Sequence, residues 1–137
     1  MILARGMAEA IFAHAEQAKP NECCGLVGGR IDGRAESIYK LRNVAESATV
    51  SYEAAAEDLF VAQREMRERN ELLLAIYHSH PRSAEPQPSD TDVRLAFYPS
   101  AIYLIIGLAG TEPTMRAFSI SERELTWQPV EYAIVDE

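Results

Sequence analysis

The chain is poor in cysteine, and the two cysteines that it has are adjacent. Cys23 and Cys24 are the only two among 137 residues. Neighbouring Cα atoms lie about 3.8 Å apart, which is shorter than the usual disulfide span, so a bridge between them would be strained. Without a third cysteine no disulfide framework can form. This predicts a reducing compartment and two thiols packed in the interior.

The chain also lacks an excess of positive charge and long apolar runs. A net charge of −8 argues against nucleic acid, whose binding proteins carry a basic face. No apolar run approaches the about 20 residues of a membrane span. The segment Met1–Gly6 is not followed by a signal-type apolar stretch, because Glu9 and Glu16 interrupt it. We therefore expect a cytoplasmic protein without a nucleic-acid or membrane partner.

The length and the apolar pattern predict one globular domain over residues 1–137. Helical spacing of apolar residues predicts helices at residues 7–18 and 53–70, the second capped by Ser51, and a short helix at 89–97. Strands are expected at residues 22–29, 35–44, 72–77, 101–108 and 114–120, with two short ones near 125–127 and 132–134. This order of elements predicts an α/β, sandwich-like fold.

Histidine is scarce, yet two of the three histidines nearly touch in sequence. His78 and His80 would project from the same face of an extended strand, because side chains alternate with period two. The apolar run 72–77 predicts a buried strand that carries both rings at its end. Pro81 favours an extended backbone at the residue before it. Two imidazoles on one face predict a metal site.

A third metal ligand is expected among the acids that follow, Glu85, Asp90 and Asp92. The sequence Ser-Asp-Thr-Asp at 89–92 resembles a capping box, in which Ser89 would bond the backbone N–H of Asp92. Asp92 would then lie in the first turn of a helix, which is a rigid mount, whereas Asp90 would point elsewhere and Glu85 lies in a flexible loop. The pattern favours Asp92. Three protein ligands and a water are typical of a catalytic zinc site.

A zinc-dependent hydrolase also needs a general base. Glu22 is the candidate, because it opens an apolar strand where a charge is unusual. An exposed glutamate at a strand end would explain this position equally well. The signal is weak when it is taken alone.

Together these elements resemble the JAMM (MPN+) metalloproteases. Their signature is a distant glutamate, then His-Ser/Thr-His-Pro, a loop and Ser-x-x-Asp, which correspond here to Glu22, His78–Pro81 and Ser89–Asp92. Residues Pro20–Leu26 also look like the Glu-x-Cys-Gly strand of small bacterial members. The resemblance implies the JAMM/MPN fold, a cytidine-deaminase-like α/β architecture with a central mixed sheet flanked by helices. The loop 81–88 is one residue longer than the family pattern.

The resemblance also implies roles for the site residues. His78, His80 and Asp92 would hold Zn²⁺ with water as the fourth ligand. Glu22 would be the general acid/base, and Ser89 would hydrogen-bond the developing oxyanion. A hydroxyl can donate one bond and accept another, so Ser89 could cap the helix as well.

The implied activity is that of a zinc-dependent peptidase or isopeptidase. Its substrate would be a ubiquitin-like or sulfur-carrier protein, cut after a C-terminal Gly-Gly tail, for instance to release cysteine. The compact chain favours the sulfur carrier, because it has little room for insertions that read polyubiquitin linkages. A metal-free MPN-type scaffold and a RadC-like protein linked to DNA repair are the alternatives. The intact ligand set speaks against the first and the acidic charge against the second. The sequence does not decide between a monomer and a homodimer.

Overall fold

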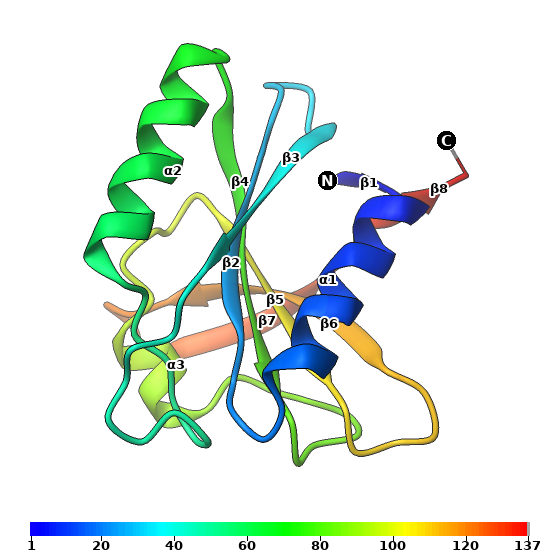
Figure 1. Cartoon of the computed structure of the whole chain (residues 1–137), viewed down its shortest axis with the longest axis vertical. Coiled ribbons are helices and arrows are strands. Elements are labelled where there is room, and N and C mark those ends of the chain that lie inside the picture. The colour runs from blue at the N-terminus through cyan, green and yellow to red at the C-terminus, as the bar shows by residue number, and fades with distance from the viewer. Residues whose placement is uncertain (137) are drawn as a thin grey trace.

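A six-stranded mixed sheet organises residues 1–136, the part of the chain that this computed structural model describes (Figure 1). The strand order is β3-β2-β4-β5-β6-β7. The strands are β2 (Cys24–Gly29), β3 (Ala35–Leu41), β4 (Leu72–His80), β5 (Ile102–Gly107), β6 (Thr114–Ser121) and β7 (Thr126–Val130). β4 and β5 run parallel, and the other neighbouring pairs are antiparallel.

Helices cover both faces of this sheet, as Figure 1 shows. α1 (Arg5–Ala18) lies on one face, and α2 (Ala56–Glu68) and α3 (Asp90–Arg94) lie on the other. A separate pair of parallel strands, β1 (Ile2–Ala4) and β8 (Ala133–Val135), brings the two ends of the described chain together. Within residues 1–136 no helix is long and apolar enough to cross a membrane. The predicted α/β class with a mixed sheet between helices is confirmed.

The period-two alternation of strand side chains divides the core into two clusters. Ala75 and Tyr77 of β4 pack in the cluster beneath α1, whereas Ile76 packs in the cluster beneath α2. His78 lies opposite Cys24 and Ile105 in the neighbouring strands, and both of these belong to the α2 cluster. The imidazole of His78 therefore emerges on the face that α2 and α3 cover.

Strand β4 is longer than the predicted 72–77. It continues through both histidines, because it pairs with β5 as far as His80 opposite Gly107. Extended backbone through Ser79 is what two rings on one face require, and the structure supplies it. β2, in contrast, begins at Cys24, so Glu22 precedes that strand rather than opening it.

The predicted cap of the second helix is wrong. α2 begins at Ala56 after an Ala55 N-cap that makes no side-chain cap bond, and the Ser51 hydroxyl instead donates to the Ser47 carbonyl. The helix starts later than expected because the preceding residues are extended, with Ala54 bridged to Asn43. Two acids in the first turn, Glu57 and Asp58, offset the positive end of the helix dipole.

Candidate metal centre

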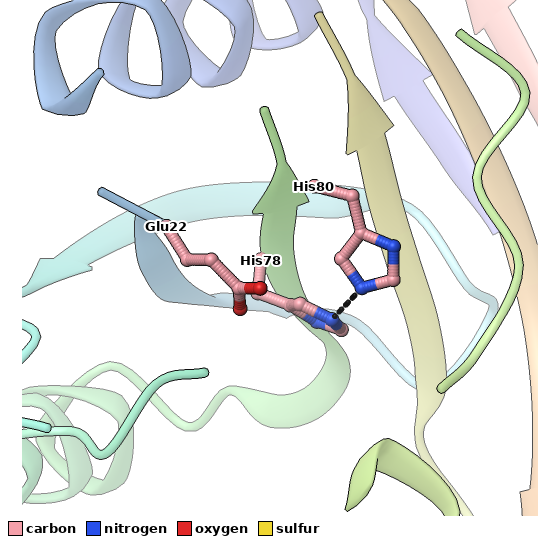
Figure 2. A group of neighbouring side chains, drawn as sticks. All are labelled: Glu22, His78 and His80. Carbon is pink, nitrogen blue, oxygen red and sulfur yellow. Dashed lines mark hydrogen bonds between the residues drawn. The ribbon is translucent and has the colours of Figure 1, made fainter. Parts of the chain in front are cut away.

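The C-terminal end of β4 brings the imidazoles of His78 and His80 close together. His78 is buried with 1% of its side chain exposed, and His80 at the strand end is 16% exposed. Their Nε2 atoms lie 3.1 Å apart, the contact drawn as a dashed line in Figure 2. Since β4 lies between β2 and β5, the backbone that carries both rings is hydrogen-bonded on its two sides.

The third group arrives from the first turn of α3. Asp92 forms the predicted capping box with Ser89: the Ser89 N–H donates to Asp92 Oδ2 at 2.9 Å, and the Asp92 N–H donates to Ser89 Oγ at 3.1 Å. The same Oδ2 lies 3.1 Å from His78 Nε2 and 3.0 Å from His80 Nε2. The other two candidate acids, Glu85 and Asp90, are exposed. The structure therefore brings Asp92 to the histidines.

This donor set suits a metal ion. Imidazole nitrogen and carboxylate oxygen are preferred zinc ligands, and tetrahedral bonds of 2.0–2.1 Å place ligand atoms about 3.3 Å apart. The three atoms here are 3.0–3.1 Å from one another. Three lone-pair donors that converge in this way repel unless protons or a cation lie between them. One cation at their centre would satisfy all three.

The environment of Asp92 keeps its carboxylate charged. Burial alone would raise its pKa. Charge attraction to His78 and hydrogen bonds with His78, His80 and the Ser89 backbone outweigh that effect and hold the pKa of Asp92 below its usual range. An ionised carboxylate is the form that binds a metal.

Glu22 lies beside the same histidine pair. Its carboxylate points toward the His78 ring (Figure 2), and the ligand atoms of Glu22, His78 and His80 all lie within 4.8 Å of one another. The residue is 5% exposed, and its Oε1 has no hydrogen-bond partner among residues 1–136. Burial, helped by the charge of Asp92 and opposed by His80, raises the pKa of Glu22 to about 7. A carboxyl group with this pKa is suited to proton transfer at neutral pH.

The two histidines thus belong to two sets of three, one completed by Asp92 and one by Glu22. The Asp92 set is tighter, because its atoms lie within 3.1 Å of one another, whereas the Glu22 set extends to 4.8 Å. Asp92 Oδ2 also receives the Ser89 N–H, which fixes its direction. The geometry favours Asp92 as a ligand and leaves Glu22 beside the ligands with a free oxygen.

Backbone contacts that the sequence did not reveal hold Glu22 in place. Its N–H donates to the Ala48 carbonyl at 2.8 Å, and its carbonyl accepts from Asn43 Nδ2 at 2.9 Å. The next residue, Cys23, donates its N–H to Ser79 Oγ at 2.8 Å. Ser79 lies between the two histidines and points to the opposite face of β4. This hydroxyl therefore connects the chain beside Glu22 to strand β4. From the sequence, only the alternation of strand side chains indicated that Ser79 faces away from the histidines.

Tyr52 is another neighbour of the site that sequence reasoning missed. Its ring stacks on the His78 imidazole, with centroids 4.7 Å apart and planes 29° from parallel. His78 Nδ1 has no hydrogen-bond partner among the described residues. A metal-binding histidine is normally oriented by a bond from its second nitrogen. Here the stacked ring of Tyr52 restrains the orientation of the imidazole.

The longer loop between the histidines and Ser89 is tied to the strands beside it. Three contacts bind it: Ala109 N–H to the Ser83 carbonyl at 3.1 Å, Thr114 Oγ1 to the Ala84 carbonyl at 2.9 Å, and Arg116 Nη1 to the Pro86 carbonyl at 3.1 Å. The extra residue is accommodated in this loop. Asp92 still reaches the histidines, and Ser89 is bonded to Asp92.

The family of the chain follows from comparison with known sequences. The profile Prok-JAB, which describes prokaryotic homologs of the JAB domain, matches residues 4–121. The chain belongs to this family, the small bacterial branch of the JAMM/MPN proteins, as its motifs predicted.

Two curated relatives carry names that describe cleavage. The CysO-cysteine peptidase of Mycobacterium tuberculosis is 31% identical over 132 residues, which cover 95% of this chain and 89% of the relative. The probable TtuB-protein conjugate cleaving protease of Thermus thermophilus is 35% identical over 118 residues, or 86% of this chain and 74% of the relative.

Solved structures agree on the fold. A protein from Desulfitobacterium hafniense superposes with a TM-score of 0.86 at 37% identity, covering 100% of this chain and 94% of that one. A JAB1/MPN domain protein from Archaeoglobus fulgidus gives a TM-score of 0.65 at 20% identity, covering 99% of this chain and 100% of that one. The second likeness shows the fold alone. The predicted JAMM/MPN fold is confirmed.

Proposed function

We propose that this protein is a zinc-dependent peptidase, formed by one domain over residues 1–137, that hydrolyses the bond after the C-terminal Gly-Gly tail of a sulfur-carrier or ubiquitin-like protein. The observation that carries the proposal is the convergence of His78, His80 and Asp92 beside Glu22, a buried acid with an unpartnered oxygen. The names of the two relatives support it, because each describes cleavage of a bond between a named protein and a cysteine or a second protein.

In this proposal His78, His80 and Asp92 hold the metal. Zinc bound there would polarise the scissile carbonyl and lower the pKa of a water molecule. Glu22 takes a proton from the water that attacks the carbonyl carbon of the last glycine. As the carbon–nitrogen bond breaks, Glu22 returns that proton to the leaving amine. The products are a carrier with a free Gly-Gly carboxylate and an amine.

Ser89 stabilises the oxygen on which charge develops. Its Oγ already accepts the Asp92 N–H, so its own proton remains free to donate. Ser89 lines a surface hollow together with Glu22 and His80. This places the donor beside the groups that act on the substrate.

Two hollows of the surface receive the two parts of the substrate. The first, the tail groove, has a volume of about 330 Å³ and is lined by Tyr52, Asp92, Tyr103 and neighbouring apolar side chains. The second, the leaving-group hollow, has a volume of about 240 Å³. Its lining is Glu22, Thr49, Val50, His80, Pro81, Arg82, Ser83 and Ser89. Glycine suits the tail groove because its backbone approaches side chains closely.

The proposal also includes a reducing cellular compartment. Both cysteines are free and buried, and burial raises the pKa of Cys23 to about 11 and that of Cys24 to about 12. A buried thiol that stays protonated at neutral pH is a poor nucleophile, so neither cysteine is expected to react. Two unpaired thiols support a cytoplasmic location.

The test uses carrier proteins with defined ends. Carriers ending in Gly-Gly-Cys and in Ala-Ala-Cys are mixed with protein that has been stripped of metal by a chelator, with or without added zinc. Mass spectrometry should show loss of the terminal cysteine from the Gly-Gly carrier in the zinc-loaded reaction alone. Carriers of unchanged mass with zinc-loaded protein would contradict the proposal and favour a non-catalytic MPN-type scaffold.

A further inference from the structure

The side chain of one arginine, Arg82, lines the leaving-group hollow. Arg82 follows the histidine motif directly and lines this hollow with Glu22, His80 and Ser89. It is the only arginine or lysine in the lining. Its side chain is exposed, and no ion pair or hydrogen bond joins it to another of residues 1–136. Its guanidinium is therefore available to a ligand.

The backbone that carries Arg82 is held on both sides. The Ser83 N–H donates to the His80 carbonyl at 3.1 Å, and the Ser83 carbonyl accepts from Ala109 at 3.1 Å. Gly107 lies beneath the loop, where a Cβ would meet the Ser83 carbonyl oxygen at 2.6 Å. The loop thus packs directly on strand β5. The fixed backbone keeps the base of the Arg82 side chain at the hollow.

The acidic groups around the hollow favour a cation at the position of Arg82. Glu22 lines it, Asp92 Oδ2 lies 3.0 Å from Nε2 of His80, which also lines it, and the whole chain carries a net charge of −8. A leaving amino acid brings an α-carboxylate of its own, two bonds beyond the nitrogen of the scissile bond. Without a nearby cation, the acids of the site would repel that carboxylate.

We propose that Arg82 binds the α-carboxylate of the amino acid released from the carrier, which makes the protein selective for substrates with a single residue after Gly-Gly. This rests on the proposed function. A guanidinium pairs with a carboxylate through two parallel hydrogen bonds. An isopeptide bond to a lysine side chain offers no carboxylate at that position. The hollow of about 240 Å³ matches one small amino acid.

Matched substrates isolate this contact. The carrier ends in Gly-Gly-Cys with a free carboxylate, in the same tripeptide with a C-terminal carboxamide, or in Gly-Gly joined to a lysine side chain. The ratio of kcat/KM for acid over carboxamide should be about ten in the zinc-loaded wild type, between the values of an exposed and a partly buried charged pair. The isopeptide should be cut no faster than the carboxamide.

Variants then assign the preference to one residue. Arg82→Gln should reduce the acid-to-carboxamide ratio to about one, and Arg82→Lys should keep part of it because a point charge remains. Arg123→Gln is the matched control: Arg123 is exposed in the turn between β6 and β7, at the opposite end of the sheet from His80, and the ratio should not change. Because both rates come from one protein, partial unfolding would lower them together and leave the ratio intact.

The outcomes separate the two proposals. A wild-type ratio near one, or an Arg82→Gln ratio equal to that of the wild type, would overturn the role of Arg82 while continued cleavage upheld the peptidase. Failure of the zinc-loaded wild type to cut any of the three substrates would overturn both. Faster cleavage of the isopeptide than of the acid would also overturn the selectivity.

Discussion

The two faces of the central sheet are covered to different degrees. A hollow of about 750 Å³ lies beside α2, and a smaller one of about 450 Å³ lies beside the last turns of α1. α1 buries Ala8, Ile11 and Ala15, and α2 buries Ala62 and Met66. On the outer side of α2, Phe60 is 71% exposed and Val61 42% exposed. The candidate metal centre lies on the less completely covered face, and each face keeps an apolar cluster of its own.

The alternation of β4 explains how one strand serves both faces. Tyr77 and Ser79 point toward α1, where Tyr77 is buried against His14, with its hydroxyl 2.7 Å from His14 Nδ1. His78 and His80 point the other way. Packing on the α1 side and the Ser79 bond to Cys23 hold the strand from behind. Rigid support behind an open site favours a preorganised arrangement.

The largest effect is expected on the face that α2 and α3 cover, from loss of a proposed ligand. Asp92→Ala should remove zinc from the purified protein and abolish cleavage, because two imidazoles alone hold a divalent ion weakly. Asp90→Ala, in the same turn, should leave zinc and activity close to those of the wild type. Metal analysis by mass spectrometry and kcat/KM measure the two effects. The opposite pattern would mean that Asp90 is the ligand.

The next effect separates chemistry from metal binding. Glu22→Gln should keep one zinc per chain and reduce kcat by about a hundred- to ten-thousandfold, because the amide cannot accept the proton. The change preserves shape and buries no new charge. Wild-type turnover in the zinc-loaded variant would remove Glu22 from the mechanism, and loss of zinc would make Glu22 a ligand.

On the face under α1 a substitution should act on stability. Ile11→Ala removes a fully buried side chain from the α1 cluster and should lower the free energy of unfolding by about 2–5 kcal/mol. Urea denaturation measures this change. Zinc content should remain at one per chain in the folded fraction. A change below about 0.5 kcal/mol would show that α1 does not pack on this face in solution.

The smallest effect should come from the outer side of α2. Phe60→Ser should change the free energy of unfolding by less than about 0.5 kcal/mol, because the side chain is mostly exposed. The same urea experiment provides the value. A loss above about 1 kcal/mol, or one that depends on protein concentration, would show that a second chain covers this side of α2 in solution.

Much of this arrangement could be predicted from local sequence. The apolar periodicities predicted α1, α2 and the central strands, and the capping box placed Asp92 correctly at the start of α3 because that motif involves neighbouring residues. The cap at Ser51 failed for the opposite reason. Pairing of Ala54 with Asn43, distant along the chain, keeps the backbone extended there. No local pattern contains that information.

The surroundings of the site were less accessible to sequence reasoning. The stacking of Tyr52 on His78 and the bond from Asn43 to the Glu22 carbonyl join residues more than twenty positions apart. Both depend on how the segment 43–53 folds over the residues that precede β2. The motif predicted the candidate site residues, whereas the fold determined which contacts orient them.

The most direct test of the account is a crystal structure of the zinc-loaded protein, with anomalous scattering measured at the zinc edge. One peak is expected at about 2.0–2.2 Å from His78 Nε2, His80 Nε2 and an Asp92 carboxylate oxygen. The Glu22 carboxylate should lie near the peak without bonding to it. A peak bonded to Glu22 in place of Asp92, or located away from both histidines, would contradict the account.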